Sequence, residues 1–147
     1  MTNHTLRPAG EADSSQIHAL IHLVGINPTG LDWKRFVVVV NDKEEVIACG
    51  QIKPHGEGIQ ELASIAVRPE YQGRGLARMV IESLLAKSSR PLYLMCRSSM
   101  GPLYEKFGFR ALDYELMPRY FQRMTKLAGL AEVLIRSGDS LLVMKLE

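Results

Sequence analysis

A glycine-rich turn at residues 72–77 has the composition of an anion-binding site. Gly73 and Gly75 stand just before an amphipathic stretch that begins at Leu76, so the turn opens a helix. The first amides of a helix have no partner within it, and the helix dipole adds partial positive charge there. Glycines let the backbone approach a diphosphate without obstruction by a Cβ atom. The whole turn reads Gln72-Gly73-Arg74-Gly75-Leu76-Ala77.

Other kinds of glycine turn compete at this position. A Rossmann dinucleotide turn requires a third small residue where Arg78 stands, and it does not follow an antiparallel meander. A P-loop requires Gly-Lys-Ser/Thr after the glycines, and that sequence does not follow. On the turn alone, a plain connection between a strand and a helix remains an alternative to a diphosphate site.

The composition of the chain restricts the classes of protein to consider. The 147 residues suffice for one domain, 46% are hydrophobic and 23% charged, which is typical of a globular protein. A net charge of +2 is too small to indicate a nucleic-acid or membrane-surface partner. Cys49 and Cys96 lie in apolar runs and are expected to be reduced thiols. The first residues lack a signal-peptide core, and no run is long enough to span a membrane, so we expect a cytoplasmic protein.

Periodicity predicts a mixed α/β domain over residues 1–147, in which a meander of antiparallel strands precedes a parallel β-α-β step. Asp13 and Gln16 indicate a capping box at the start of a helix that ends at Gly25. Strands are expected at residues 5–8, 35–40, 46–53, 60–67, 91–96, 109–116 and 141–146. Helices are expected at residues 13–24, 76–87, 101–107 and 118–137.

Two motifs carry a resemblance to a known family. Gln72, Gly75 and Ala77 match the pattern Gln/Arg-x-x-Gly-x-Gly/Ala, and residues 65–69 resemble the strand that leads into that turn. Residues 103–109 are similar to a helix-to-strand motif that follows later in the same family. The chain therefore resembles the GNAT superfamily of N-acetyltransferases, and the order of elements agrees over residues 6–109.

The resemblance implies a GNAT-like fold that uses acetyl-CoA as co-substrate and moves its acetyl group to a primary amine by direct attack in a ternary complex. The pantetheine arm would bind the backbone of Ile65, Ala66 and Val67. The pyrophosphate would bind the turn from Gln72 to Ala77. An amide of the same strand would polarise the thioester carbonyl, which is the largest electrostatic contribution in acyl transfer.

Two further side chains are candidates for proton transfer. Tyr104 matches the family position whose phenol lies near the thioester sulfur, so we assign it as general acid, with a packing aromatic as the alternative. Glu61 lies early on the strand that leads to the turn, and similar glutamates remove the amine proton in some relatives. A solvated glutamate at a strand edge is the alternative for Glu61.

The sequence departs from the family pattern in two places. Residues 96–100 contain no Asn where many relatives have one, and Ser98 or Ser99 would have to replace it. The helix at 118–137 is an insertion before the last strand. Packing against the sheet or a second subunit explains its apolar stripe, and the alternative is a wall of the acceptor site that favours acidic substrates. Its basic residues are Arg119, Arg123, Lys126 and Arg136.

Partners and metals are less defined by the sequence. The acceptor is expected to be a small-molecule or protein amine, with a homodimer left open. His18 and His22 are spaced for one helix face, but no third ligand accompanies them, so no metal site is expected. His55 lies in a loop and receives no role. A non-catalytic sensor of coenzyme A or acyl-CoA, or an interaction module on the same fold, is the alternative to an enzyme.

Overall fold

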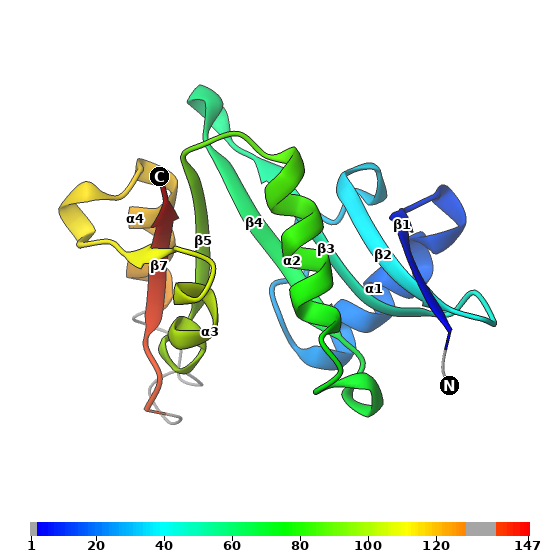
Figure 1. Cartoon of the computed structure of the whole chain (residues 1–147). Helices are drawn as coiled ribbons and strands as arrows, with labels where there is room; N and C mark the ends of the chain where they lie inside the picture. The colour runs from blue at the N-terminus through cyan, green and yellow to red at the C-terminus, as the bar shows by residue number, and fades with distance from the viewer. Residues whose placement is uncertain (1–2, 129–137) are drawn as a thin grey trace. The chain divides into compact units, whose positions relative to one another are not determined.

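The computed structural model describes residues 3–128 and 138–147. The chain divides into two compact units, and Figure 1 labels most of the helices and strands that they contain. The first comprises Met1–Lys53 and Leu62–Ser88, and the second comprises Pro54–Glu61 and Ser89–Glu147.

The first unit is built on strands that pair in the order β1-β2-β3-β4. The β1–β2 and β2–β3 pairs are antiparallel, with Leu6 opposite Val39 and Val38 opposite Cys49. The register shifts between Val39 and Val40, which marks an irregularity in β2. The strands are β1 (His4–Pro8), β2 (Phe36–Asn41), β3 (Val46–Pro54) and β4 (Gln60–Val67), with β4 entering this unit at Leu62.

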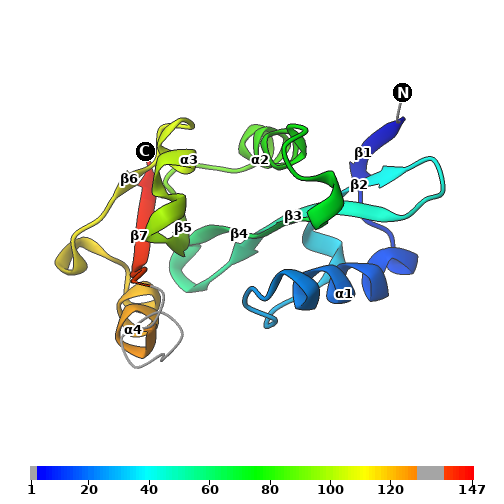
Figure 2. The same ribbon diagram turned by 90° about the horizontal axis from the view of Figure 1, so that it is seen from below.

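Helices cover both faces of this sheet. Helix α1 (Ser14–Val24) and helix α2 (Leu76–Lys87) lie on opposite sides of the strands in Figure 2. Ile17 and Ile21 of α1 join Val38 of β2 and Cys49 of β3 in one buried cluster. A strand covered on both faces must be apolar on both, and this explains why β2 is buried along its whole length.

The two ends of α1 differ in how well the sequence predicts them. Gly25 takes a left-handed conformation, and its amide donates to the Ile21 and His22 carbonyls, as expected for a helix stop. The predicted capping box at Asp13 is wrong, because the helix start has no side-chain cap. The Asp13 carboxylate instead accepts hydrogen bonds from Arg7 at 2.7 Å and from the Gly10 amide at 2.8 Å.

The second unit has an antiparallel sheet in the order β5-β7-β6. Its strands are β5 (Leu92–Arg97), β6 (Arg110–Ala111) and β7 (Leu141–Leu146). Helices α3 (Gly101–Glu105) and α4 (Arg119–Ala128) lie on opposite sides of β5 and β7 (Figure 2). Fully buried Phe121 of α4 packs with Tyr93 and Val143 in the core of this unit.

Two predicted elements of this unit need correction or qualification. The strand expected at 109–116 is shorter, because β6 ends at Ala111, one last hydrogen bond joins the Leu112 amide to the Val143 carbonyl at 2.9 Å, and a 3-10 turn occupies Tyr114–Leu116. The inserted helix before the last strand is confirmed as α4, which is described as far as Ala128. The rest of the predicted helix, including Arg136, lies outside the described residues. The element order β4-α2-β5 is that of the predicted β-α-β step, and the mixed α/β class is confirmed.

Within the described part of the chain, no helix has both the length and the apolar character that crossing a membrane requires.

Gly50 of β3 provides a test of packing in the first unit. A Cβ atom there would lie 2.6 Å from Ile65 Cδ1, 2.6 Å from Val80 Cγ1 and 3.1 Å from Leu84 Cδ1. Overpacking of a filled core typically costs about 1–3 kcal/mol, so we expect Gly50→Ala to lower the free energy of unfolding by that amount in urea titration.

The matched control is Gly56→Ala, because nothing lies within 4 Å of a Cβ built at Gly56. Its free energy of unfolding should stay within about 0.5 kcal/mol of the parent value. Equal effects of the two substitutions would contradict the packing of α2 on β3 and β4.

Candidate functional site

The predicted diphosphate turn has the backbone conformation that its glycines suggest. Gly73 and Gly75 have φ values of +78° and +80°, in the left-handed region that favours glycine. Nothing lies within 4 Å of a Cβ built at either glycine. The backbone of the turn is therefore not covered by other atoms at these glycines, and most residues with a side chain would be strained in this conformation.

Helix α2 begins directly after this turn. Its first ladder bond runs from the Met79 amide to the Gly75 carbonyl at 3.1 Å, so the amides of Leu76, Ala77 and Arg78 precede the ladder. Such amides, with the helix dipole, are suited to bind phosphate oxygens. Because the turn combines open glycines with these amides, the residues present fit the diphosphate of coenzyme A.

Two residues of the turn, Gln72 and Arg74, contact the segment that precedes it. The Gln72 amide donates to the Pro69 carbonyl at 3.3 Å, and the Arg74 guanidinium lies 5.2 Å from the centre of the Tyr71 ring. Arg74 remains exposed, so it keeps donors for an anion. The amides from Gly73 onward are therefore better placed for a diphosphate than that of Gln72.

The predicted pantetheine strand contains an irregularity beside the three assigned residues. Ser64 has φ of +60°, which is rare for a residue with a side chain. Its Oγ accepts from Gln51 Nε2 at 2.8 Å, and its carbonyl accepts from Cys49 Sγ at 3.5 Å. Irregular positions of this kind redirect backbone groups and cluster near functional sites. Ile65, Ala66 and Val67 follow it as the last residues of β4.

Tyr104 lies in the second unit, on α3. Its ring is only 9% exposed and meets Phe109 edge to face, with 6.2 Å between ring centres. Burial, and to a smaller extent the negative charge that Cys96 would carry as a thiolate, raises the pKa of Tyr104 to about 12. The phenol therefore keeps its proton across the physiological pH range and can act only as a donor there.

Glu61 also lies in the second unit, and it is not a solvated edge residue. It is 3% exposed, and its Oε1 lies 2.8 Å from His55 Nε2. The alternative of a solvated glutamate is therefore wrong. The role of Glu61 as a base stays a prediction.

His55 and Tyr120 complete what we call the Glu61 cluster, which consists of His55, Glu61 and Tyr120. The His55 ring stacks on Tyr120 with 3.9 Å between ring centres and an interplanar angle of 28°. Burial, and to a smaller extent the Glu61 charge, raises the pKa of Tyr120 above its usual value. Sequence reasoning assigned no role to His55 or Tyr120. At the hairpin tip the His55 amide donates to the Ile59 carbonyl at 2.8 Å, which turns the chain back toward Glu61.

Several other predicted candidates have structural roles. Ser98 Oγ, the Ser99 amide and Ser99 Oγ all donate to the Asp139 carboxylate, which ties the end of β5 to the start of β7. His18 and His22 are exposed, and no set of metal-binding side chains occurs among residues 3–128 and 138–147. Phe121 anchors α4 to the sheet of its unit, as the packing interpretation of that helix predicts.

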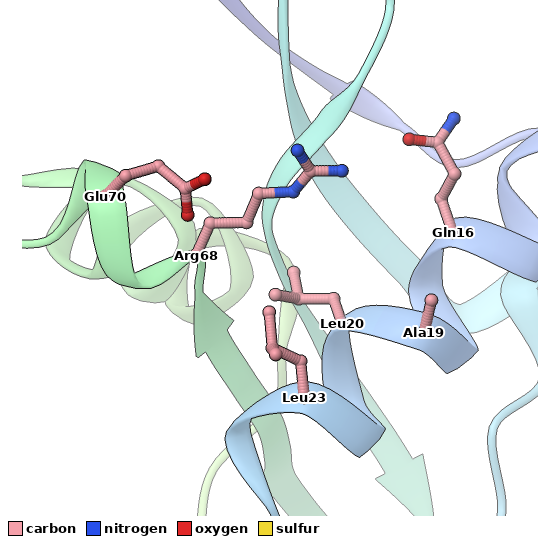
Figure 3. Close-up of a pocket in the computed structure, with 6 residues that line it drawn as sticks. All are labelled: Gln16, Ala19, Leu20, Leu23, Arg68 and Glu70. Carbon is pink, nitrogen blue, oxygen red and sulfur yellow. The ribbon is translucent and has the colours of Figure 1, made fainter.

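An open pocket of about 170 Å³ lies in the first unit but contains none of the predicted site residues. In Figure 3, Leu20 and Leu23 point from α1 toward Arg68. Its remaining lining residues are Gln16, Ala19 and Glu70. None of the residues assigned to acetyl transfer therefore lines this pocket.

The assigned residues are divided between the units as follows. Ile65, Ala66, Val67 and the turn from Gln72 to Ala77 belong to the first unit. Tyr104 and Glu61 belong to the second unit, on α3 and at the start of β4.

Comparison with known families decides the membership of the chain. The family described as "Acetyltransferase (GNAT) domain" matches residues 32–111, more than half of the 147 residues. The chain belongs to the GNAT acetyltransferase family. The matched segment contains β2 to β6, the glycine turn, Glu61 and Tyr104, so the predicted resemblance is confirmed.

Individual GNAT relatives are distant in sequence. An amino-acid acetyltransferase of Salmonella typhi is 26% identical over 110 residues, which are 71% of this chain and 24% of that protein. The chain thus spans about a quarter of the length of the curated relatives it matches.

Solved structures agree with the GNAT fold. N-acetylglutamate synthase from Neisseria gonorrhoeae, complexed with coenzyme A and N-acetyl-glutamate, matches with a TM-score of 0.73 at 18% identity, over 100% of this chain and 36% of that one. Escherichia coli ElaA matches with a TM-score of 0.69 at 12% identity, over 100% of both chains. At these identities the structures establish the GNAT fold.

The raised pKa of Tyr104 predicts a measurable loss of stability in alkali. An unfolded phenol titrates near pH 10, whereas folded Tyr104 titrates at about pH 12. Its contribution to stability is therefore complete below pH 10 and is lost as the pH rises toward 12. Removing the phenol in Tyr104→Phe should reduce the alkaline loss in free energy of unfolding by about 2 kcal/mol.

The control is Tyr114→Phe, which should lose stability in parallel with the parent protein over the same pH range. Chemical denaturation at a series of pH values measures both. If Tyr104→Phe also followed the parent curve, Tyr104 would not be buried as described.

Proposed function

We propose that this GNAT chain transfers an acetyl group from acetyl-CoA to a primary amine by direct attack in a ternary complex. The observation that carries the proposal is the turn at Gly73 and Gly75, which opens α2 within the family-matched segment. We also propose that both units belong to one acetyltransferase domain, because the match at 32–111 includes residues of each.

Backbone groups of the first unit bind the co-substrate in this proposal. Acetyl-CoA supplies the acetyl thioester. Amides from Gly73 to Ala77, assisted by Gln72, bind the diphosphate, and the backbone of Ile65, Ala66 and Val67 binds the pantetheine arm. An amide of β4 donates to the thioester carbonyl oxygen and stabilises its negative charge during attack.

Tyr104 and Glu61 handle the protons. The amine nitrogen forms a bond to the acetyl carbon, and the bond from that carbon to sulfur breaks. Tyr104 donates its proton to the leaving sulfur, and its high pKa supports this role because the proton is always present. Glu61 accepts the proton that the ammonium form of the acceptor must lose, through a water molecule.

The Glu61 cluster supports a positioned base. His55 and Tyr120 contact the carboxylate or its hydrogen-bond partner, so the orientation of Glu61 is fixed before an acceptor arrives. We assign His55 as a positioning residue for Glu61.

The acceptor class is proposed from the relatives. The Salmonella relative is an amino-acid acetyltransferase, and the gonococcal synthase was solved with N-acetyl-glutamate. We therefore propose a free amino acid as acceptor.

Acetyl-CoA should bind through the glycine turn and be consumed only with an amine present. We expect Gly75→Asn to weaken acetyl-CoA binding roughly tenfold or more, because its side chain enters the diphosphate approach while Asn tolerates the left-handed backbone. Thermal unfolding at increasing acetyl-CoA measures binding. Thiol release together with mass spectrometry of an amine panel measures transfer.

Gly25→Asn is the matched control, since Gly25 has φ of +74° and open space in the same unit. It should leave acetyl-CoA binding unchanged. No binding by the parent protein would contradict the assignment of the turn. Binding without transfer to any amine would favour the sensor function instead.

Glu61→Gln should produce a rate loss that depends on pH. Without its base the enzyme must wait for acceptor already deprotonated in solution, so kcat/KM should fall about a hundredfold near pH 7 and recover as the pH approaches the acceptor pKa. His55→Asn should show a smaller loss, and the KM for acetyl-CoA should stay constant in both variants.

Glu57→Gln, at the exposed hairpin tip, is the control and should retain the parent pH profile. A pH-independent loss in Glu61→Gln would indicate a structural role for Glu61 and leave the base unassigned.

A further inference from the structure

Lys53, at the end of β3 in the first unit, is a buried cation that the mechanism above does not use. It is 8% exposed, and its Nζ donates to the Thr29 carbonyl at 3.1 Å. Among residues 3–128 and 138–147, Lys53 forms no ion pair. A buried ammonium with one neutral acceptor is costly, because it has lost water and its hydrogen bond to Thr29 uses only one of its three N–H groups.

The loop between α1 and β2 is shaped around Lys53. Gly30 has φ of +66°, and a Cβ built there would lie 2.9 Å from Lys53 Cε and 3.1 Å from its Nζ. Any other residue would displace the ammonium. The position of the Lys53 side chain therefore requires a residue without a Cβ atom at Gly30.

A second cation is fixed at the neighbouring carbonyl. Arg35 Nη2 donates to the Gly30 carbonyl at 2.8 Å, and Arg35 Nε donates to Gln51 Oε1 at 3.1 Å. Fully buried Gln51 also donates to the Gly30 carbonyl at 3.1 Å. Arg35 and Lys53 therefore hold consecutive loop carbonyls, and the described structure shows no ion pair for Arg35 either.

The loop itself does not neutralise these charges. Asp32 is its single carboxylate, and its Oδ1 accepts from the Lys34 amide at 3.1 Å. Two fixed cations without a carboxylate partner favour an anionic ligand, and a buried Lys with a positioned Arg suits a carboxylate.

We propose that Lys53 and Arg35 form a binding subsite for the carboxylate of the acceptor, so that this chain acetylates amines that carry a carboxylate. The assignment rests on the proposed acetyl transfer for its substrate role. It adds a recognition element that the transfer chemistry does not require. In the proposed function, the diphosphate of acetyl-CoA is bound by the amides and Arg74 at the start of α2. The acceptor is the other ligand, so we assign the anion at Lys53 and Arg35 to a carboxylate of the acceptor.

Kinetics with matched acceptors test the subsite. Each proteinogenic α-amino acid is compared with its α-carboxamide, which has the same side chain and amine but no negative charge at that end. The parent protein should prefer the carboxylate form. Lys53→Met should lower kcat/KM for that form about ten- to a hundredfold, the usual range for a lost charged hydrogen bond. The carboxamide form and the KM for acetyl-CoA should be unaffected.

Lys43→Met is the charge-matched control, because Lys43 is exposed in the hairpin turn of the same unit. It should retain the full preference for the carboxylate. Equal use of both acceptor forms by the parent, an equal loss of both in Lys53→Met, or a raised KM for acetyl-CoA would each overturn the proposal.

Thermal unfolding distinguishes this subsite from a purely structural lysine and does not depend on turnover. N-acetylated amino acids should stabilise the parent protein, and their carboxamides should not, while Lys53→Met should lose that response. Without ligand, Lys53→Met should unfold at the same or a higher temperature, because an uncompensated buried charge is gone. A lower melting temperature with no loss of the ligand response would show that Lys53 serves only to hold the loop.

The two proposals can fail separately. If no amine is acetylated but the stabilisation by N-acetylated amino acids depends on Lys53, the carboxylate subsite stands and the transfer proposal fails. If amines are acetylated without discrimination between acid and carboxamide, transfer stands and the subsite fails.

Discussion

A polar group that leaves water must find a partner inside the protein, and this constraint organises the interior of both units. Every buried side-chain nitrogen and oxygen among the described residues has at least one hydrogen-bond partner. Gln51, with no exposed surface, meets Arg35, Gly30 and Ser64 at once. That network links the loop after α1 to the irregular position in β4, so two segments for which we propose ligand contacts share one set of hydrogen bonds.

The same constraint explains how two of the buried charged side chains, Glu61 and Lys53, differ. The Glu61 carboxylate lies within hydrogen-bond distance of His55, and the Tyr120 ring stacks on the His55 ring. Lys53 is matched only by a carbonyl dipole, which compensates less of the lost hydration. This difference is why Lys53, and not Glu61, is the side chain for which we propose an anionic ligand.

The parts of the site that follow from local backbone chemistry were predictable. Gly73 and Gly75 before an apolar helix predict an open turn, and the structure has it because glycine adopts the left-handed conformation with no steric cost. The β-branched run at residues 35–40 similarly predicts a strand, which the structure has as β2. Asp13 was mispredicted because Arg7, which is remote from the helix pattern, binds its carboxylate. His55 and Tyr120 were missed because their contact joins a hairpin tip to a helix more than 60 positions later, and single-sequence periodicity carries no such information.

The stack between His55 and Tyr120 gives α4 an influence that its sequence alone does not suggest. Because α4 supplies the surface against which the histidine ring lies, it sets the orientation of the ring that holds the Glu61 carboxylate. A different helix at this place would change the orientation of Glu61, the base that we propose, without changing a residue of the sheet. Under the proposed function, divergence in an inserted helix is then a route to new acceptors that leaves unchanged the strand proposed to bind the co-substrate.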